Sequence, residues 1–202
     1  MSLQNEPRWL PIAPWLFLFV WSAGYGVAKL ALESTTPLNL LALRFVGATL
    51  ALLPFVLIFR PVWPEKRAIR DLLVVAIFLQ LGHFLCIYFG LALGASAGVL
   101  ALFAASQPVL IAIVASLVNQ CIPPPRVWAG LLVGLLGASW VIVVQGNFSD
   151  GALLGAVLGF VAVVSLSLGQ VYDKSQRPEC HPLLVYVIQY AFASIVSVPI
   201  AL

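Results

Sequence analysis

Charged residues are scarce in this sequence. Only 8% of its 202 residues are Asp, Glu, Lys or Arg, whereas 62% are hydrophobic. An ordinary soluble domain carries roughly 25% charged residues, because polar side chains must cover its outer surface. This shortage excludes a conventional water-soluble core and predicts that the lipid bilayer is the main partner of the chain.

Cysteine and other ligand-type residues are also sparse. Three scattered cysteines, Cys86, Cys121 and Cys180, give neither a disulfide framework nor the ligand spacing of a zinc site. No phosphate-binding loop of the form G-x-x-x-x-G-K-S/T occurs, which excludes a self-contained ATP-driven pump. The net charge is only +3 and its basic residues lie in short connections, so nucleic-acid binding has no support. We therefore expect no metal, no cofactor and no nucleic-acid partner.

Long apolar runs are what the sequence does contain. Each has about the 20 residues that a membrane-spanning helix needs, and apolar residues cover all faces instead of alternating as in a barrel strand. The predicted fold is an all-α, multi-pass bundle of about seven transmembrane helices. The predicted spans are Leu10 to Leu32, Leu38 to Phe59, Leu72 to Leu93, Ala97 to Val118, Val127 to Gln145, Ala152 to Tyr172 and Leu183 to Leu202.

The basic residues predict the orientation of these spans. Lys and Arg concentrate in short cytoplasmic loops. With the N-terminus inside, one side of the membrane receives most of them: Arg8, Arg60, Lys66, Arg67, Arg70, Arg126, Lys174 and Arg177. The opposite loops contain Glu33 and Asp150. We expect a protein of the cytoplasmic membrane with a cytoplasmic N-terminus.

An internal repeat emerges when the sequence is shifted by 145 residues. The shift aligns Ser22, Gly24, Lys29, Pro37, Leu38, Ala48 and Pro54 with Ser167, Gly169, Lys174, Pro182, Leu183, Ala193 and Pro199. Five spans separate the two copies, so the second copy is inverted. Inverted repeats are typical of transporters with a site near the bilayer midplane, although two apolar segments with Gly and Pro can also align by chance. The expected organisation is a five-helix repeat at 1–146 and an incomplete second repeat, of two helices, at 147–202.

Several motifs resemble the drug/metabolite transporter superfamily, EamA type. They are Trp21-Ser22 with Lys29, Pro37 with Ala42-Leu43-Arg44-Phe45, Tyr88 to Ala92, Ser96-Ala97-Gly98, Ser106 to Val109, and Trp128 to Val143 with its three glycines. The resemblance implies a ten-helix carrier with inverted five-helix repeats around a central cavity, commonly exporting amino acids, other metabolites or drugs.

Two departures from the family pattern stand out. Asn119 to Pro125 lacks the acidic residue that usually follows the fourth helix. The last three helices of the family are also missing, which predicts a truncated second repeat. One side of the cavity would then have no helices to enclose it. A lone copy would then be inactive or would self-associate.

Three ionisable residues fall within the predicted spans. Lys29 and Arg44 lie in the outer halves of the first two helices, where long side chains either extend to the interface or orient an anionic substrate group. His83 lies near the middle of the third helix, as a proton relay or as a neutral residue bonded between helices. We expect all Asp and Glu residues to lie in loops or at helix ends.

Polar and aromatic side chains complete the candidate substrate site. We predict that it draws on Trp21, Tyr25, Lys29, Arg44, His83, Tyr88, Gln107, Gln170 and Tyr172. Glycines four residues apart, at Gly151, Gly155 and Gly159 and at Gly90, Gly94 and Gly98, predict close helix packing. The G-x-S-x-G pattern at Gly94 to Gly98 joins two helices and has no partner triad, so we expect no enzyme and no catalytic residue.

The predicted function is secondary transport, the export of small metabolites such as amino acids or drugs by alternating access. The alternative is a membrane fragment or a helix-packing or assembly subunit that transports nothing.

Overall fold

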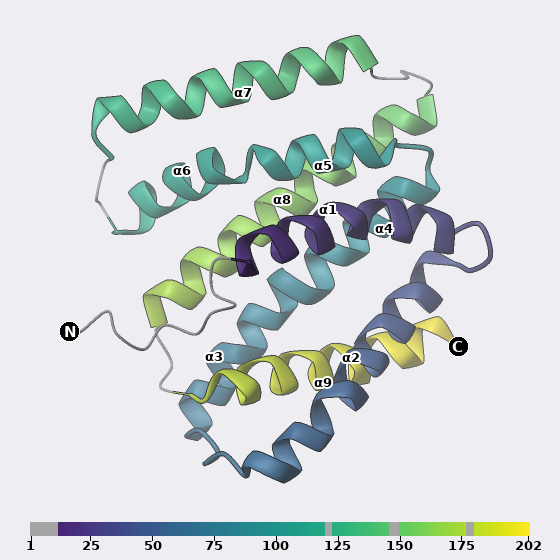
Figure 1. Ribbon diagram of the computed structural model, residues 1–202, viewed down its shortest axis with the longest axis vertical. Helices are drawn as coiled ribbons and strands as arrows, with labels where there is room; N and C mark the ends of the chain where they lie inside the picture. Colours follow the sequence, from purple (N-terminus) through teal and green to yellow (C-terminus); the bar gives the residue numbers. More distant parts are fainter. Residues whose placement is uncertain (1–11, 120–122, 146–149, 177–179) are drawn as a thin grey trace.

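The computed structural model describes residues 12–119, 123–145, 150–176 and 180–202 (Figure 1). Within these residues every regular element is helical. The elements are α1 (Ala13–Ala31), α2 (Pro37–Phe59), α3 (Lys66–Ala76), the π-helix η2 (Ile77–Gly82), α4 (His83–Ala92), α5 (Ala97–Ala105), α6 (Gln107–Asn119), α7 (Pro125–Gln145), α8 (Asp150–Gln176) and α9 (Pro182–Ala201).

These elements form seven helical rods in the described part of the chain, because α3, η2 and α4 are continuous and α5 and α6 meet at Ser106. Five rods are long and apolar enough to cross a membrane: Pro37–Phe59, Lys66–Ala92, Ala97–Val118, Gly151–Gln176 and Pro182–Ala201. The remaining two, α1 and α7, contain 19 and 21 residues. The predicted all-α transmembrane bundle is confirmed.

Local sequence explains where several helices begin. Thr36 caps α2 by accepting a hydrogen bond from the Asn39 amide at 3.3 Å, and Pro37 occupies the first turn, where no amide donor is needed. His181 caps α9 in the same way, accepting from the Leu183 amide at 3.3 Å. These caps satisfy backbone groups that would otherwise lack a partner at the helix start.

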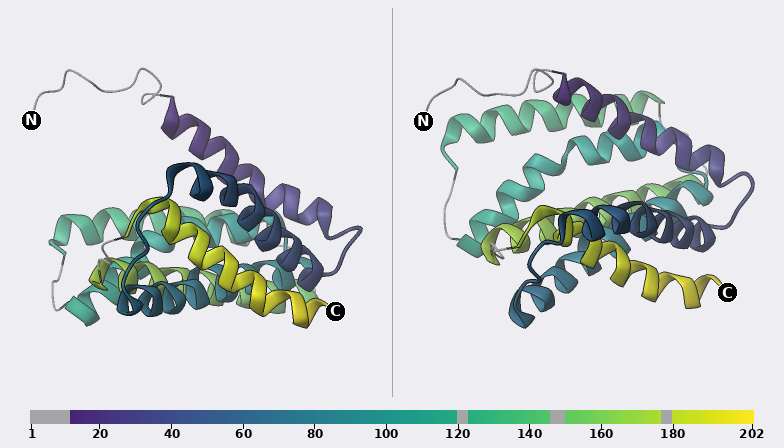
Figure 2. Two further views of the ribbon diagram at one scale, coloured as in Figure 1. Left: turned by 90° about the horizontal axis from the view of Figure 1, so that it is seen from below. Right: turned by 60° about the horizontal axis from the view of Figure 1, so that its bottom comes forward.

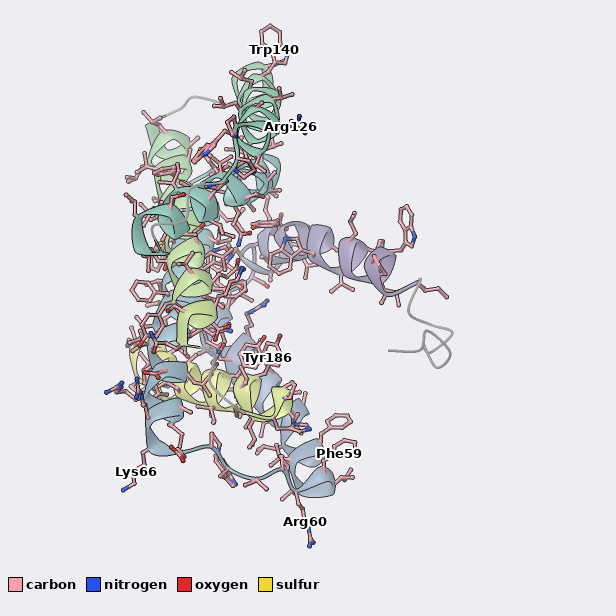
Figure 3. The ribbon with its side chains drawn as sticks, turned by 90° about the vertical axis from the view of Figure 1, so that its left-hand side faces the viewer. Phe59, Arg60, Lys66, Arg126, Trp140 and Tyr186 are labelled. Carbon is pink, nitrogen blue, oxygen red and sulfur yellow. The ribbon has the colours of Figure 1, made fainter. Side chains whose placement is uncertain are left out.

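The rods pack mainly in pairs. Helix α4 lies along α8, and α2 lies along α9, whereas α7 packs on the outer side of α5 and α6 (Figure 1). Helix α1 contacts α4 and α5, and its N-terminal end projects away from the other helices (Figures 2 and 3). The space beside α1 is therefore less enclosed than the space between the other rods.

Small residues bring α8 close to its neighbours. A Cβ atom on Gly155 would clash with the Gly90 carbonyl oxygen, and one on Gly151 would lie 2.7 Å from the Leu93 carbonyl oxygen. The predicted glycine contact of α8 is therefore confirmed. Of the other trio only Gly90 is in such a contact: Gly94 adopts φ +100 in a turn, and the nearest atom to a Cβ on Gly98 is 3.9 Å away.

Helices α2 and α9 run in opposite directions (Figures 1 and 2). They begin at Pro37 and Pro182, and the hydroxyls of Thr49 and Ser194, 145 residues apart, lie 3.3 Å from each other. Helices α2 and α9, which the 145-residue shift aligns, therefore also meet in space.

Candidate substrate-binding cavity

A cavity of about 500 Å³ lies between α1, α2 and α4. Its lining is mostly aliphatic and aromatic, with few polar groups, as in small-molecule sites. The lining residues are Phe19, Val20, Trp21, Ala23, Gly24, Tyr25, Val27, Ala28, Ala31, Leu40, Arg44, His83, Phe84, Ile87 and Tyr88.

The structure brings five of the nine predicted site residues to this cavity: Trp21, Tyr25, Arg44, His83 and Tyr88. The other four lie elsewhere. Lys29 is exposed in the last turn of α1, Gln107 begins α6, Gln170 is half-buried in α8, and Tyr172 lies near the C-terminal end of α8.

Arg44 is the only charged residue in the lining of the cavity. Its guanidinium carbon lies 3.9 Å from the centroid of the Phe84 ring, within cation–π range. Tyr88 lines the same cavity. Aromatic contacts thus position the guanidinium at the cavity without a carboxylate in the lining.

Tyr25 adds a polar atom to the apolar wall formed by α1. The residue is 9% exposed, and its hydroxyl has no hydrogen-bond partner within the described parts of the chain. Buried polar groups are generally paired, since an unpaired one loses its hydration without compensation. The Tyr25 hydroxyl therefore has an unused hydrogen-bonding capacity in a residue that lines the cavity.

His83 is held between two helices. It is buried, and its Nδ1 lies 3.0 Å from the Ala162 carbonyl oxygen in α8. A carbonyl only accepts, so Nδ1 donates the proton in this bond. The geometry supports the expectation of a neutral histidine bonded between helices.

The π-helix η2 creates a polar layer below the cavity. The Ser165 hydroxyl donates to the Phe78 carbonyl oxygen at 2.9 Å, and Gln80 Nε2 donates to Gln189 Oε1 at 3.1 Å. Gln80 Oε1 has no partner among the described residues. This layer joins α3–α4 to α8 and α9.

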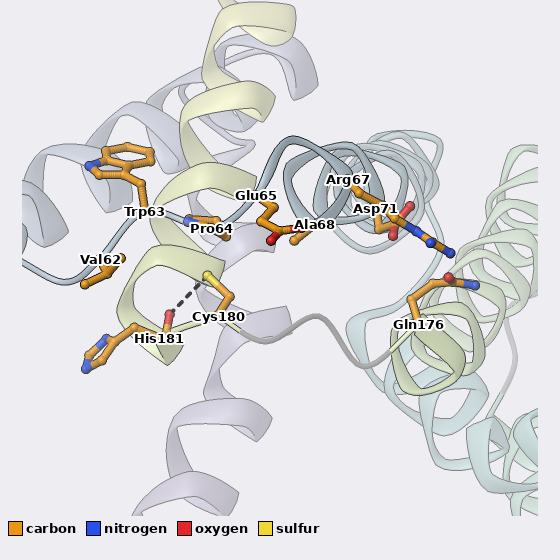
Figure 4. A pocket seen from close by; sticks show the side chains of 10 residues that line it. All are labelled: Val62, Trp63, Pro64, Glu65, Arg67, Ala68, Asp71, Gln176, Cys180 and His181. Carbon is orange, nitrogen blue, oxygen red and sulfur yellow. Dashed lines mark hydrogen bonds between the residues drawn. The ribbon is translucent and has the colours of Figure 1, made fainter.

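A second pocket, of about 740 Å³, lies at the other end of the bundle (Figure 4). The loop that follows α2 and the segment that precedes α9 both contribute to it, through Trp63 and Cys180 among others. Because they line one pocket, the two connections lie at the same end of the molecule.

Asp71 lines this second pocket and differs from the expectation of an acid at a helix border. Helix α3 begins at Lys66, earlier than the predicted span, so Asp71 lies within it and is 4% exposed. Its Oδ1 accepts from Arg70 Nη2 at 3.2 Å and from the Tyr172 hydroxyl at 3.2 Å. Tyr172 thus ties α8 to α3 instead of lining the cavity.

Sequence reasoning missed Phe84, Gln189 and Ser165. Gln189 is a polar residue within an apolar span, a signal that could have identified it. Phe84 and Ser165 carry no comparable signal, because their roles depend on neighbouring helices. Across the described residues, no group of three or more His, Cys, Asp or Glu side chains could hold a metal ion.

Comparison with known proteins gives one match. The model of a family described as the EamA-like transporter family matches residues 11–143. No curated protein and no solved structure matches the chain.

Proposed function

Because the chain belongs to the EamA-like transporter family, we propose that it is a secondary transporter that exports small metabolites, such as amino acids or drugs, by alternating access. The cavity between α1, α2 and α4 is the proposed substrate site. Trp21, Tyr25, Arg44, His83 and Tyr88 are its proposed binding residues.

The observation that carries this proposal is the position of Arg44 in the cavity wall. A charged side chain within a membrane span is costly and usually serves a pathway or a ligand. Arg44 lies in α2, one of the apolar spans, and its guanidinium lies over Phe84 at an accessible cavity. The apolar helix α2 thus places its charged residue, Arg44, where a solute can reach it.

The two ends of the bundle support alternating access. The cavity lies on one side of the Gln80–Gln189 layer, and the Asp71–Tyr172 contact lies on the other. A transporter needs a barrier that opens on one side of its site while the other side stays closed. These hydrogen bonds are the proposed closed barrier.

The internal repeat sets the proposed arrangement of the helices. We assign residues 1–146 to the first repeat, which contains the matched residues 11–143. Residues 147–202 hold the first two helices of the second, inverted repeat. The antiparallel pair α2 and α9 and the Thr49–Ser194 contact support this assignment. The cytoplasmic membrane and a cytoplasmic N-terminus follow from the basic loops.

The test is a flux screen with the purified 202-residue chain in liposomes, using amino acids and other small metabolites. We expect at least one compound to be transported. Arg44→Ala lowers its flux roughly tenfold or more, because a hydrogen bond to a charged group contributes about 1.5–3 kcal/mol. Lys29→Ala, which removes an exposed cation outside the cavity, serves as the matched control and stays near wild type.

Failure of every compound to cross wild-type liposomes would contradict transport and favour an assembly subunit. Equal flux in the two variants would remove Arg44 from the site while leaving transport in place.

A further inference from the structure

The chemistry of the cavity wall is selective in charge. Resting on the proposed function, and naming the substrate class of the same cavity, we propose that it binds amphipathic monocarboxylates: a single carboxylate on an apolar or aromatic body, with no ammonium group. This class narrows the proposed metabolites to acids other than amino acids. The geometry assigns the carboxylate to Arg44 and Tyr25.

The first argument is the unbalanced charge of Arg44. In the described parts of the chain the one ion pair joins Arg70 to Asp71, which line or border the second pocket. The cavity lining contains no Asp or Glu. Arg44 is exposed at the cavity, and a guanidinium binds a carboxylate through charge-assisted hydrogen bonds.

The second argument is an unused hydrogen-bond donor in the lining of the same cavity. Tyr25 is 9% exposed and lines the same cavity. Its hydroxyl lacks a hydrogen-bond partner within the described residues. A phenolic hydroxyl donates one hydrogen bond. A carboxylate has two oxygens and can accept from Arg44 and from Tyr25.

The third argument excludes a cationic group on the ligand. An ammonium would be repelled by Arg44 and would find no carboxylate in the lining. One face of Phe84 already contacts the guanidinium of Arg44, so an ammonium would have to bind other aromatic rings of the lining in the presence of the Arg44 charge. Asp71, the buried carboxylate, lies at the second pocket. Amines and zwitterions therefore bind less well than the corresponding acid.

The fourth argument concerns the body of the ligand. Aromatic and aliphatic residues form most of the wall, including Trp21, Ile87 and Tyr88, and the volume of about 500 Å³ suits a small molecule. A flat apolar body gains free energy by leaving water for such a wall. A bare inorganic anion lacks this contribution.

The test uses three ligands with one body. Phenylpropionate carries a carboxylate and phenylethylamine carries an ammonium. Phenylalanine carries both groups. Equilibrium binding is measured by titration calorimetry on the purified chain in lipid nanodiscs, without any transport step. We expect phenylpropionate to bind about tenfold or more tightly than phenylethylamine, which lacks the carboxylate and its charge-assisted hydrogen bond. We expect it also to bind more tightly than phenylalanine, because Arg44 repels the ammonium of phenylalanine.

Three variants locate the selectivity. Arg44→Gln removes the preference for phenylpropionate, whereas Arg44→Lys keeps the charge and the order of the three ligands. Tyr25→Phe weakens phenylpropionate about three- to tenfold and leaves phenylethylamine unchanged, because only the carboxylate uses the hydroxyl. Circular dichroism of each variant reports its helix content. If Arg44→Gln is misfolded, the wild-type ranking and Tyr25→Phe decide the question.

The proposal is overturned if phenylalanine or phenylethylamine binds as tightly as phenylpropionate, or if folded Arg44→Gln keeps the preference. Its failure is distinct from failure of the proposed function. Selective carboxylate binding with no flux in liposomes supports the ligand class and contradicts transport, whereas flux of an amine without carboxylate selectivity does the reverse.

Discussion

At the scale of single residues, buried polar side chains connect the helices. Gln80 is 6% exposed and Gln189 is 3% exposed, and their side chains share one hydrogen bond at 3.1 Å. In a membrane protein such bonds contribute about 0.6 to 2 kcal/mol, less than the cost of isolating a buried amide. Removing one partner of the Gln80–Gln189 pair should therefore cost more stability than removing both.

We predict that Gln189→Leu lowers the free energy of unfolding by about 1–2 kcal/mol, because Gln80 then lacks its bonded partner. Combining it with Gln80→Leu recovers part of this loss, since no buried amide remains at the contact. Denaturation of the purified protein in micelles, followed by circular dichroism, measures both effects. A double variant less stable than the sum of the two single changes would contradict the account.

The site residues show how far sequence alone could reach. Trp21 and Tyr25 lie four residues apart and therefore share a face of α1, and both line the cavity. Lys29 continues that spacing in the last turn of α1 but does not line the cavity, although Ala28 and Ala31 do. Spacing predicts which side chains share a face. It does not predict which of those side chains the neighbouring rods contact and which they leave exposed, as Lys29 is.

At the scale of elements, the seven rods were predictable because each apolar run is long enough to span a bilayer. The π-helix was not. Its extra residue per turn is accommodated by contacts from α8, where Ser165 bonds the Phe78 carbonyl and Gly169 lies against Leu79. These partners lie more than 80 residues away in sequence, so no local pattern in Ile77–Gly82 reveals the irregular turn.

Helix α8 provides an element-scale prediction. Gly155→Ala places a methyl group against the Gly90 carbonyl and 2.9 Å from the Ala95 Cβ. We expect it to lower the free energy of unfolding by about 1–3 kcal/mol, the usual cost of overpacking. Denaturation in micelles measures the change.

The matched control is Gly134→Ala in α7, where no atom lies within 4 Å of the added methyl group. Alanine favours a helix over glycine by about 1 kcal/mol, so this variant should match or exceed wild-type stability. Equal destabilisation by both substitutions would show that α8 does not depend on the close approach.

At the scale of the whole molecule, successive connections between spanning helices lie on alternate sides of the membrane, so the order of the helices determines which loops share a side. Trp63 and Cys180 line one pocket (Figure 4). Ser34 lies in the connection between α1 and α2, at the opposite end of α2. With the N-terminus inside, the first two positions face the cytoplasm.

We predict that a membrane-impermeant maleimide labels Ser34→Cys in intact cells but labels Cys180 and Trp63→Cys only after permeabilisation. Each cysteine is tested alone, in a background lacking the others. Burial raises the pKa of the Cys180 thiol, so its reactive thiolate is scarce at neutral pH and its labelling accelerates as the pH increases. Labelling of Trp63→Cys and Cys180 from different sides would contradict the inverted-repeat assignment.

The open flank of α1 affects how binding should be measured. Phe19, Val20 and Val27 line the cavity yet are 74%, 67% and 62% exposed, so in a bilayer this wall adjoins acyl chains. A hydrophobic solute can then arrive sideways from the lipid phase, where its concentration is set by its partition coefficient. Apparent dissociation constants will scale with the lipid-to-protein ratio of each preparation, and ligands of different hydrophobicity become comparable only after that correction.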